Sequence, residues 1–366
     1  MGRSAGEGQQ TTSEILPLTS IRGVAALWVM YGHLIGPVLR VVGGAHPEAR
    51  RLLTNLARGD QFAVDIFFVL SGYIMIVAYG TQVDAARFYL HRFARVYPLH
   101  ILVLGAAITG FYLLQYKALQ PDAYSSTNLI FYLTLTFVWI GLPPAWNPPS
   151  WSLSAEVFAY IFFPLVQLAA GGFNRRYAIL CVCLLGAAHT MVLALLGFAD
   201  TGIGALLRGL LGFWAGALLR ASLVHPMPLA PATGAVAIAA AVVFDQFEYA
   251  VPAIISLIGG LGVNRSGTLI DALSTRPIVW LGKISYSIYL IHFPLLIGSE
   301  RVLSKFNVLQ SRAGQFVFCL SYIAAVLCIS HLSWRFFETP ARVAIYRWCS
   351  MRMNRAHREH STPSKC

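Results

Sequence analysis

Eleven apolar runs, separated by short polar segments, constrain the fold of this chain more than any other feature. The runs cover residues 17–40, 61–80, 97–116, 127–142, 151–171, 177–198, 203–221, 229–244, 250–263, 278–299 and 313–337. A helix of about 20 apolar residues crosses the hydrocarbon core of a bilayer, which is about 30 Å thick. The runs at 127–142 and 229–263 are short enough to hold a re-entrant piece. We therefore predict an all-α polytopic integral membrane protein with a bundle of ten or eleven transmembrane helices.

The composition agrees with a membrane protein. Of 366 residues, 57% are hydrophobic and 11% are charged, with a mean hydropathy of +0.64, whereas soluble domains carry about 25% charged residues. The net charge is +12. Most of the excess lies in short loops and in the segment 342–365, where membrane proteins place cytoplasmic Lys and Arg. We therefore expect no nucleic-acid partner.

The chain divides into a polar N-terminal tail at 1–14, one membrane domain at 15–340 and a basic C-terminal tail at 341–366. The first apolar run is too long for a signal peptide and lacks its cleavage site, so we expect it to remain as a helix. No internal repeat and no loop long enough for a soluble domain is visible. The sequence therefore predicts a single membrane domain.

The basic segments give conflicting signals about topology. The segment 87–95 and the C-terminal tail both favour the cytoplasm, which predicts ten spans with both termini inside. Arg50 and Arg51, which follow the first apolar run, favour the opposite side, as do Arg175 and Arg176. We favour ten spans because two long basic segments then share one side.

The six cysteines predict neither a disulfide framework nor a metal site. Four lie in apolar runs and two in the basic tail: Cys181, Cys183, Cys319, Cys328, Cys349 and Cys366. Cys181 and Cys183 are two residues apart, so on a helix they point to different sides and do not share an ion. We expect free cysteines that pack as small hydrophobic residues.

Arg22 and His33 are the two strongly polar side chains of the first apolar run. Eleven positions at about 100° each return to within about 20° of the same helix face, and they separate the two side chains by about 16 Å along the axis. Ionisable groups inside a membrane are costly and indicate a functional site by default. The alternative is an interfacial Arg and a His that bonds to a neighbouring helix.

The second long run contains Asp65, followed by Ser71 and Gly72. A carboxylate in an apolar helix needs a cation or a hydrogen-bond donor, and Arg22 or His33 would serve. The small residues allow another helix, or a ligand, to approach the backbone closely. Simple helix packing, with Asp65 near the membrane interface, explains the pattern equally well.

Arg92 and Arg95 are three residues apart and share a helix face among aromatic residues. A pair of guanidinium groups suits phosphate, because each can bind it through two hydrogen bonds. The alternative is a basic anchor at the cytoplasmic end of a helix.

The segment 143–150 is too rich in proline to be helical, and it leads into Trp151 and another apolar run. Ser152 and Glu156 lie one turn apart on the same face. Glu156 is in the second helical turn, so N-terminal capping does not explain it well. Such a carboxylate either pairs with Arg or His or works as an acid or base.

Ser285, Tyr289 and His292 stand at i, i+4 and i+7, which aligns a hydroxyl, a phenol and an imidazole on one face of a late helix. Hydrogen bonding between helices is the alternative role.

Five further polar or helix-breaking residues lie in the apolar runs or at their ends. In the last run we expect Pro340 to end the helix and Glu338 to pair with Arg335. His189 is interpreted as a core histidine, and Arg208 as a possible cation facing a pore.

Together and in this order, these motifs resemble the acyltransferase-3 family, bacterial membrane proteins that O-acylate carbohydrates and other acceptors. The matching positions are Arg22 and His33, Phe67–Tyr73, Arg92 and Arg95 with Pro98, Trp151–Leu153 with Glu156, Ser285 and Tyr286 with Tyr289, Leu290, His292 and Pro294, and Glu338–Pro340. The resemblance spans about residues 15–340. One departure is Phe293, which separates His292 from Pro294 where many relatives have the two adjacent.

The resemblance implies that a cytoplasmic acyl-CoA, usually acetyl-CoA, is the co-substrate, with no bound cofactor or metal. It also implies a carbohydrate acceptor and a multi-pass position in the bacterial inner membrane. Some relatives carry an extracytoplasmic esterase-like domain, which we do not expect in a chain of this length. The acceptor, the acyl group and the oligomeric state stay open.

The expected chemistry is attack of a hydroxyl on a thioester, which needs a base and donors for the oxyanion. We expect His33 to be the base, oriented by Glu156 or Asp65. Arg92 and Arg95 would bind the phosphates of CoA, and Arg22 would steer the donor or stabilise charge. The supporting residues are Asp65, Ser71, Trp151, Ser285, Tyr289 and His292. Direct transfer and an acyl-enzyme at His33 or Ser71 both stay open.

Two other classes of function fit parts of the pattern. A transporter or flippase of a lipid-linked sugar would also bury His, Arg and Glu along a pathway. The lack of visible inverted repeats and the paired arginines at one end argue against it. A structural or regulatory membrane protein would satisfy the same polar groups with contacts alone.

Overall fold

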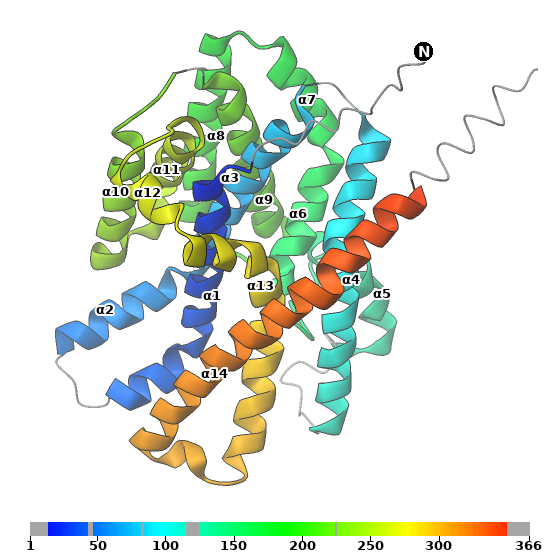
Figure 1. Ribbon diagram of the computed structural model, residues 1–366, viewed down its shortest axis with the longest axis vertical. Helices are drawn as coiled ribbons and strands as arrows, with labels where there is room; N and C mark the ends of the chain where they lie inside the picture. Colours follow the sequence, from blue (N-terminus) through cyan, green and yellow to red (C-terminus); the bar gives the residue numbers. More distant parts are fainter. Residues whose placement is uncertain (1–13, 43–46, 82–83, 115–123, 224, 350–366) are drawn as a thin grey trace, which may run out of the picture.

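The computed structural model describes residues 14–42, 47–81, 84–114, 124–223 and 225–349, which contain helices and no strand (Figure 1). The helices are α1 Leu16–Val42, α2 Pro47–Arg58, α3 Asp60–Tyr79, α4 Ala85–Leu113, α5 Leu129–Leu133, α6 Trp151–Ile161, α7 Phe163–Gly172, α8 Arg175–Leu196, α9 Gly202–Ser222, α10 Ala230–Phe244, α11 Val251–Val263, α12 Thr268–Leu273, α13 Arg276–Ser304 and α14 Arg312–Ser333. The predicted all-α membrane class is confirmed.

Seven helices in the described residues are long and apolar enough to cross a membrane. An eighth candidate is the pair α6–α7, which bends by 54° where Pro164 enters the first turn of α7. The helices α10 and α11 have 15 and 13 residues and are shorter than a standard span. The predicted count of ten or eleven spans is therefore not confirmed.

The run at 127–142 is not a spanning helix. It forms the short helix α5 and a separate 3-10 turn at Phe137–Ile140, joined through Leu135 with a φ of 57°. Leu135 and Phe137 are fully buried. The apolar character of this run therefore serves packing against the protein rather than passage through lipid.

Two pairs of helices form the centre of the molecule. α1 packs along α13, and α3 packs along α9. A Cβ at Gly72 would collide with the Phe213 carbonyl, and one at Gly216 would collide with the Val69 carbonyl. Small residues thus bring α3 and α9 into backbone contact, as the predicted small patch at Ser71–Gly72 requires. The element that approaches the backbone at that patch is the helix α9.

Two prolines lie inside helices. Pro98 lies within α4, and Arg92 and Arg95 belong to this continuous helix, as the shared helix face predicted. The helix after α14 passes through a π turn at Trp334–Glu338 and continues beyond Pro340 to Cys349. The prediction that Pro340 ends the helix is wrong.

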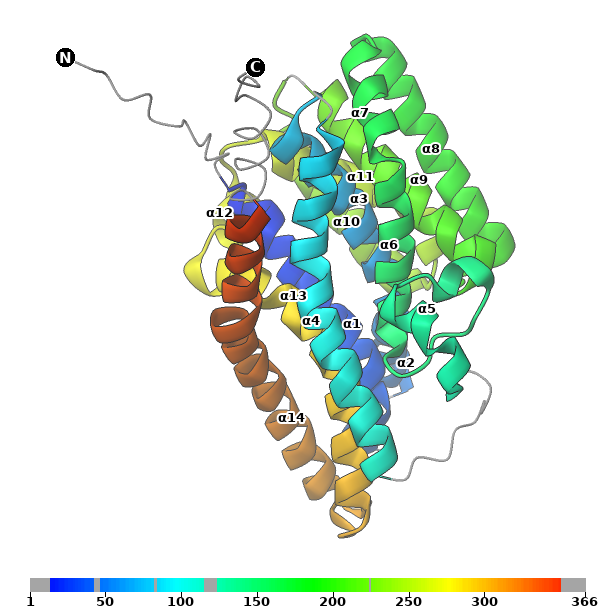
Figure 2. The same ribbon diagram turned by 90° about the vertical axis from the view of Figure 1, so that its right-hand side faces the viewer.

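The two ends of the described chain lie on the same side of the molecule. α1 begins and the helix after α14 finishes toward one end, while the α13–α14 connection forms the opposite end (Figure 2). α8 lies at one edge and α14 at the other, with α1, α3 and α13 between them (Figure 2).

Candidate active site

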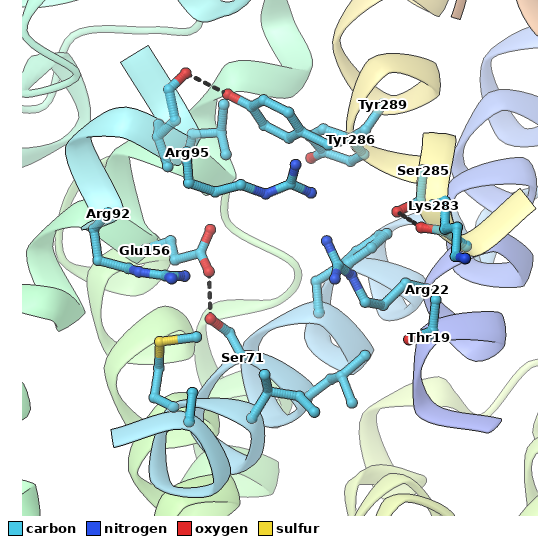
Figure 3. Close-up of a pocket in the computed structure, with 18 of the residues that line it drawn as sticks. Thr19, Arg22, Ser71, Arg92, Arg95, Glu156, Lys283, Ser285, Tyr286 and Tyr289 are labelled. Carbon is cyan, nitrogen blue, oxygen red and sulfur yellow. Dashed lines mark hydrogen bonds between the residues drawn. The ribbon is translucent and has the colours of Figure 1, made fainter. Parts of the chain in front are cut away.

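A cavity of about 500 Å³ lies among α1, α3, α4, α6, α13 and the helix after α14. We call it the basic cavity (Figure 3). Its polar and aromatic lining residues include Glu14, Arg22, Ser71, Arg92, Arg95, Ser152, Glu156, Tyr160, Lys283, Ser285, Tyr286, Tyr289 and Arg342. The structure thus brings together seven of the predicted site residues from five helices that are distant in sequence.

Cations outnumber carboxylates around the basic cavity. Five of its lining side chains are Lys or Arg and two are Glu. Lys283 lies 3.8 Å from the Glu14 carboxylate. The guanidinium of Arg22 points into the cavity (Figure 3) and has no hydrogen bond or ion pair within the described part of the chain. A cavity of this charge favours an anionic ligand.

Arg92 is held by aromatic side chains. One of its terminal nitrogens donates to the Tyr79 hydroxyl at 3.3 Å, and the guanidinium lies 5.7 Å from the Tyr79 ring and 5.9 Å from the Tyr160 ring. Cation–π contacts fix its direction without neutralising it. Arg92 therefore keeps its charge available to a ligand.

Arg95 is engaged more firmly. It forms an ion pair with the buried carboxylate of Glu338 and lies 4.9 Å from the Tyr286 ring. The other carboxylate oxygen of Glu338 accepts a hydrogen bond from Ser287 at 3.1 Å. The expected pair of Glu338 with Arg335 is wrong, because the π turn directs Glu338 into the bundle.

Glu156 is also satisfied within the basic cavity. One carboxylate oxygen accepts from Ser71 at 2.5 Å and from Tyr160 at 2.7 Å (Figure 3). Tyr160 stands one helical turn after Glu156 on α6. The expectation that Glu156 orients His33 is not met here, because His33 lies in a different cavity.

A smaller cavity of about 70 Å³ surrounds His33. We call it the His33 cavity. Its lining residues are Val29, His33, Asp60, Gln61, Val64, Pro148, Pro149, Trp151, Asp200 and Tyr289. Of the predicted site residues it contains His33, Trp151 and Tyr289.

The contacts of His33 define its tautomer. Nδ1 lies 3.0 Å from the Val29 carbonyl, which only accepts, so Nδ1 carries the proton of the neutral ring. His292 makes the same contact with the Ile288 carbonyl at 3.0 Å, and its Nε2 lies 3.4 Å from Nδ1 of His33. Nε2 of His33 is therefore the unprotonated nitrogen, as a general base requires.

Tyr289 lines both cavities. Its hydroxyl donates to the Pro149 carbonyl at 2.9 Å and lies 2.7 Å from the Ser152 hydroxyl. Pro149 faces the His33 cavity and Ser152 the basic cavity. The two cavities thus meet at one phenol.

Asp65 belongs to neither cavity. Its carboxylate binds Arg208 at 3.1 Å and 3.3 Å and His189 at 3.1 Å, and all three side chains are fully buried. The expected partners Arg22 and His33 are wrong, as is a pore-facing Arg208. His189 is a core histidine, as predicted.

Ser285, the remaining member of the predicted stripe on α13, bonds to its own helix. The Ser285 hydroxyl donates to the Gly282 carbonyl of its own helix at 2.8 Å. It lines the basic cavity but directs its hydrogen bond along the helix.

Sequence reasoning missed several residues of both cavities. These are Asp60, Gln61, Tyr160, Asp200, Lys283 and Arg342. Asp60 and Asp200 stand at the ends of apolar runs, where acidic residues ordinarily face water. Arg342 was assigned to the tail, because Pro340 was expected to end the helix.

No site for a metal ion of three or more His, Cys, Asp or Glu side chains occurs in the described ranges. The five cysteines among them are free, and Cys183 and Cys328 are exposed rather than buried. The expectation that the cysteines are buried is therefore met by Cys319 and Cys349 and is wrong for Cys183 and Cys328.

Residues 18–335 match a protein family described as an acyltransferase domain. Peptidoglycan O-acetyltransferase OatA of Listeria monocytogenes is 27% identical over 338 residues, which are 80% of this chain and 53% of that protein. Acyltransferase MdmB of Streptomyces mycarofaciens is 30% identical over 151 residues, 40% of this chain and 38% of that protein. The chain spans about half the length of such curated relatives or less. No solved structure matches it.

Proposed function

The chain belongs to the acyltransferase-3 family, which matches residues 18–335, and on this premise we propose that it is a membrane O-acyltransferase of the bacterial inner membrane. It moves an acyl group, acetyl in the first place, from cytoplasmic acyl-CoA to a hydroxyl of a carbohydrate such as exopolysaccharide or lipopolysaccharide. The Listeria relative is a peptidoglycan O-acetyltransferase, which supports both the acetyl group and the class of acceptor.

The basic cavity is the donor site in this proposal. Coenzyme A carries several phosphate groups, and guanidinium groups bind phosphate through paired hydrogen bonds. Arg22 and Arg92 both direct uncompensated charge into the cavity. Arg92 and Arg95 of α4 and Arg342 of the helix after α14 line the cavity together, so the two basic segments that favour the cytoplasm meet there, which supports entry of the donor from that side.

The reaction takes place at His33. Nε2 removes the proton of the acceptor hydroxyl as its oxygen attacks the thioester carbonyl carbon. The new C–O bond forms, the C–S bond breaks, and the proton held by His33 passes to the departing CoA thiolate. A base positioned in this way contributes about 10²–10⁴-fold to a rate.

The observation that carries the proposal is that Tyr289 joins the two cavities. Arg22 and His33 lie eleven residues apart on α1, about 16 Å along the axis, one in each cavity. A donor with its phosphates near Arg22 therefore directs its long pantetheine arm along α1 toward His33. The Tyr289 side chain, held by the Pro149 carbonyl and the Ser152 hydroxyl, lines the route that the thioester takes between the two cavities.

Radiolabelled acetyl transfer tests this proposal. Membranes with equal amounts of wild type or His33→Ala receive acetyl-CoA labelled in the acetyl group, and label in polysaccharide and lipid is counted. We expect His33→Ala to lose at least about 100-fold in rate. His331→Ala is the matched control, because that half-buried imidazole lies on α14 beside Trp280 and outside both cavities. Equal labelling by wild type and His33→Ala would refute the mechanism.

A further inference from the structure

The two cavities have opposite charge. The basic cavity has five Lys or Arg side chains in its lining, whereas the His33 cavity has the carboxylates of Asp60 and Asp200 and no Lys or Arg. The guanidinium of Arg208 lies behind the wall of the His33 cavity, fully buried and bonded to Asp65. The two substrates therefore meet environments of different sign.

Asp60 is packed directly beside His33. It is the first residue of α3, and a Cβ on Gly32 of α1 would collide with its side chain. Asp60 and His33 line the same cavity. One carboxylate oxygen of Asp60 accepts the Gln61 backbone N–H at 2.6 Å, which fixes the side chain at the start of the helix.

The rest of the wall suits a polar ligand with one apolar face. The side-chain oxygen of Gln61 is buried and has no hydrogen-bond partner in the described structure. The Trp151 ring is buried and held from behind by Arg208 at 4.9 Å. Arg208 also donates to the Gln61 carbonyl at 3.0 Å and to the Ala199 carbonyl at 2.7 Å, next to Asp200. This bracing fixes three walls of the cavity at once.

We propose that the His33 cavity is the acceptor subsite and that it selects an uncharged sugar, an inference that rests on the proposed function. The carboxylates of Asp60 and Asp200 accept hydrogen bonds from sugar hydroxyls, and they repel a carboxylate or phosphate on the acceptor. Like charges brought together at a binding site weaken binding. Neither Lys nor Arg in the lining offsets this repulsion.

The size of the cavity limits what enters it. Its volume of about 70 Å³ is much smaller than the about 500 Å³ of the basic cavity. A cavity of this size suits a hydroxyl-bearing edge of a sugar. The attacking hydroxyl therefore enters toward Nε2 of His33, and the charge next to it on the acceptor decides the affinity.

Two sugars that differ by one charge test the inference. The full chain in detergent, with saturating acetyl-CoA, is given N-acetylmuramic acid or its neutral amide, and kcat/KM is measured for each. We expect the wild type to prefer the amide by at least tenfold. Asp60→Asn and Asp200→Asn each bring the ratio toward one by raising kcat/KM for the acid relative to the amide, whereas Asp60→Glu keeps the preference.

Asp271→Asn is the matched control, because this exposed carboxylate lies on α12 outside both cavities, and it should keep the wild-type ratio. A wild-type ratio near one, or the same ratio in all variants, would overturn the inference. Transfer to neither sugar by a protein whose donor turnover depends on His33 would overturn it as well. Failure of the proposed function has a different signature, namely equal transfer by wild type and His33→Ala.

Discussion

At the scale of single residues, the arginines of the basic cavity are not equivalent. Arg22 carries a guanidinium with no partner in the described residues, Arg92 is held by neutral aromatic rings, and Arg95 is paired with Glu338. A charge that is already paired adds little to the binding of an anion, since the ligand must compete with the carboxylate. Under the proposed function, the motif of two arginines therefore contains one residue for the ligand and one for the fold.

This division predicts different outcomes for the two arginines of α4. Arg95→Ala leaves the buried carboxylate of Glu338 without its cation, and breaking a buried pair costs about 3–5 kcal/mol. We expect a lower thermal unfolding temperature in detergent for Arg95→Ala, partly restored in Arg95→Ala with Glu338→Gln. Arg92→Ala should instead raise the KM for acetyl-CoA with little change in unfolding temperature. Equal unfolding temperatures for Arg95→Ala and wild type would contradict the assignment.

At the scale of helices, contact between α3 and α9 fixes where the site residues stand. Ser71 and Phe68 of α3 line the basic cavity, and Gly72 and Gly216 set the distance between the two helices. Behind them, Asp65 ties α3 to Arg208 of α9 and His189 of α8. The floor of the site is therefore a rigid set of three helices.

Added volume at this contact should be costly. Gly216→Ala places a methyl group against the Val69 carbonyl, and overpacking costs about 1–3 kcal/mol. Gly105→Ala on α4 is the control, because a Cβ there meets no atom within 4 Å and Ala favours a helix by about 1 kcal/mol. Thermal unfolding in detergent should fall for Gly216→Ala and hold or rise for Gly105→Ala. The reverse order would mean that the α3–α9 contact is looser than described.

At the scale of the whole molecule, the sequence predicts the long helices well because their apolar runs exceed the thickness of a bilayer. α1, α3 and α13 begin and end close to the predicted runs at 17–40, 61–80 and 278–299. The run at 127–142 does not form a spanning helix, although it is apolar. Burial against other helices and exposure to lipid select the same apolar residues. Hydropathy alone does not separate the two.

The site was predictable where a motif carried it and unpredictable where the packing of helices decided it. Arg22, Arg92 and Glu156 meet in one cavity, as their shared resemblance to a family suggested. The partner of Asp65 depends on which helix faces α3, and that is a long-range property that spacing along the chain does not contain. The same holds for Asp60, whose place beside His33 follows from the close approach of α1 at Gly32.

The central claim is that donor and acceptor chemistry occupy two cavities joined at Tyr289. Initial rates at varied acetyl-CoA, with purified wild type, Arg22→Ala, His33→Ala and the control Arg40→Ala, test it most directly. Arg40 is suited as a control because it lies on the same helix, largely exposed, near Glu300. We predict that Arg22→Ala raises the KM for acetyl-CoA with a smaller change in kcat, and that His33→Ala lowers kcat and leaves that KM near the wild-type value. A rise in KM of equal size for both variants would contradict the separation of the two cavities.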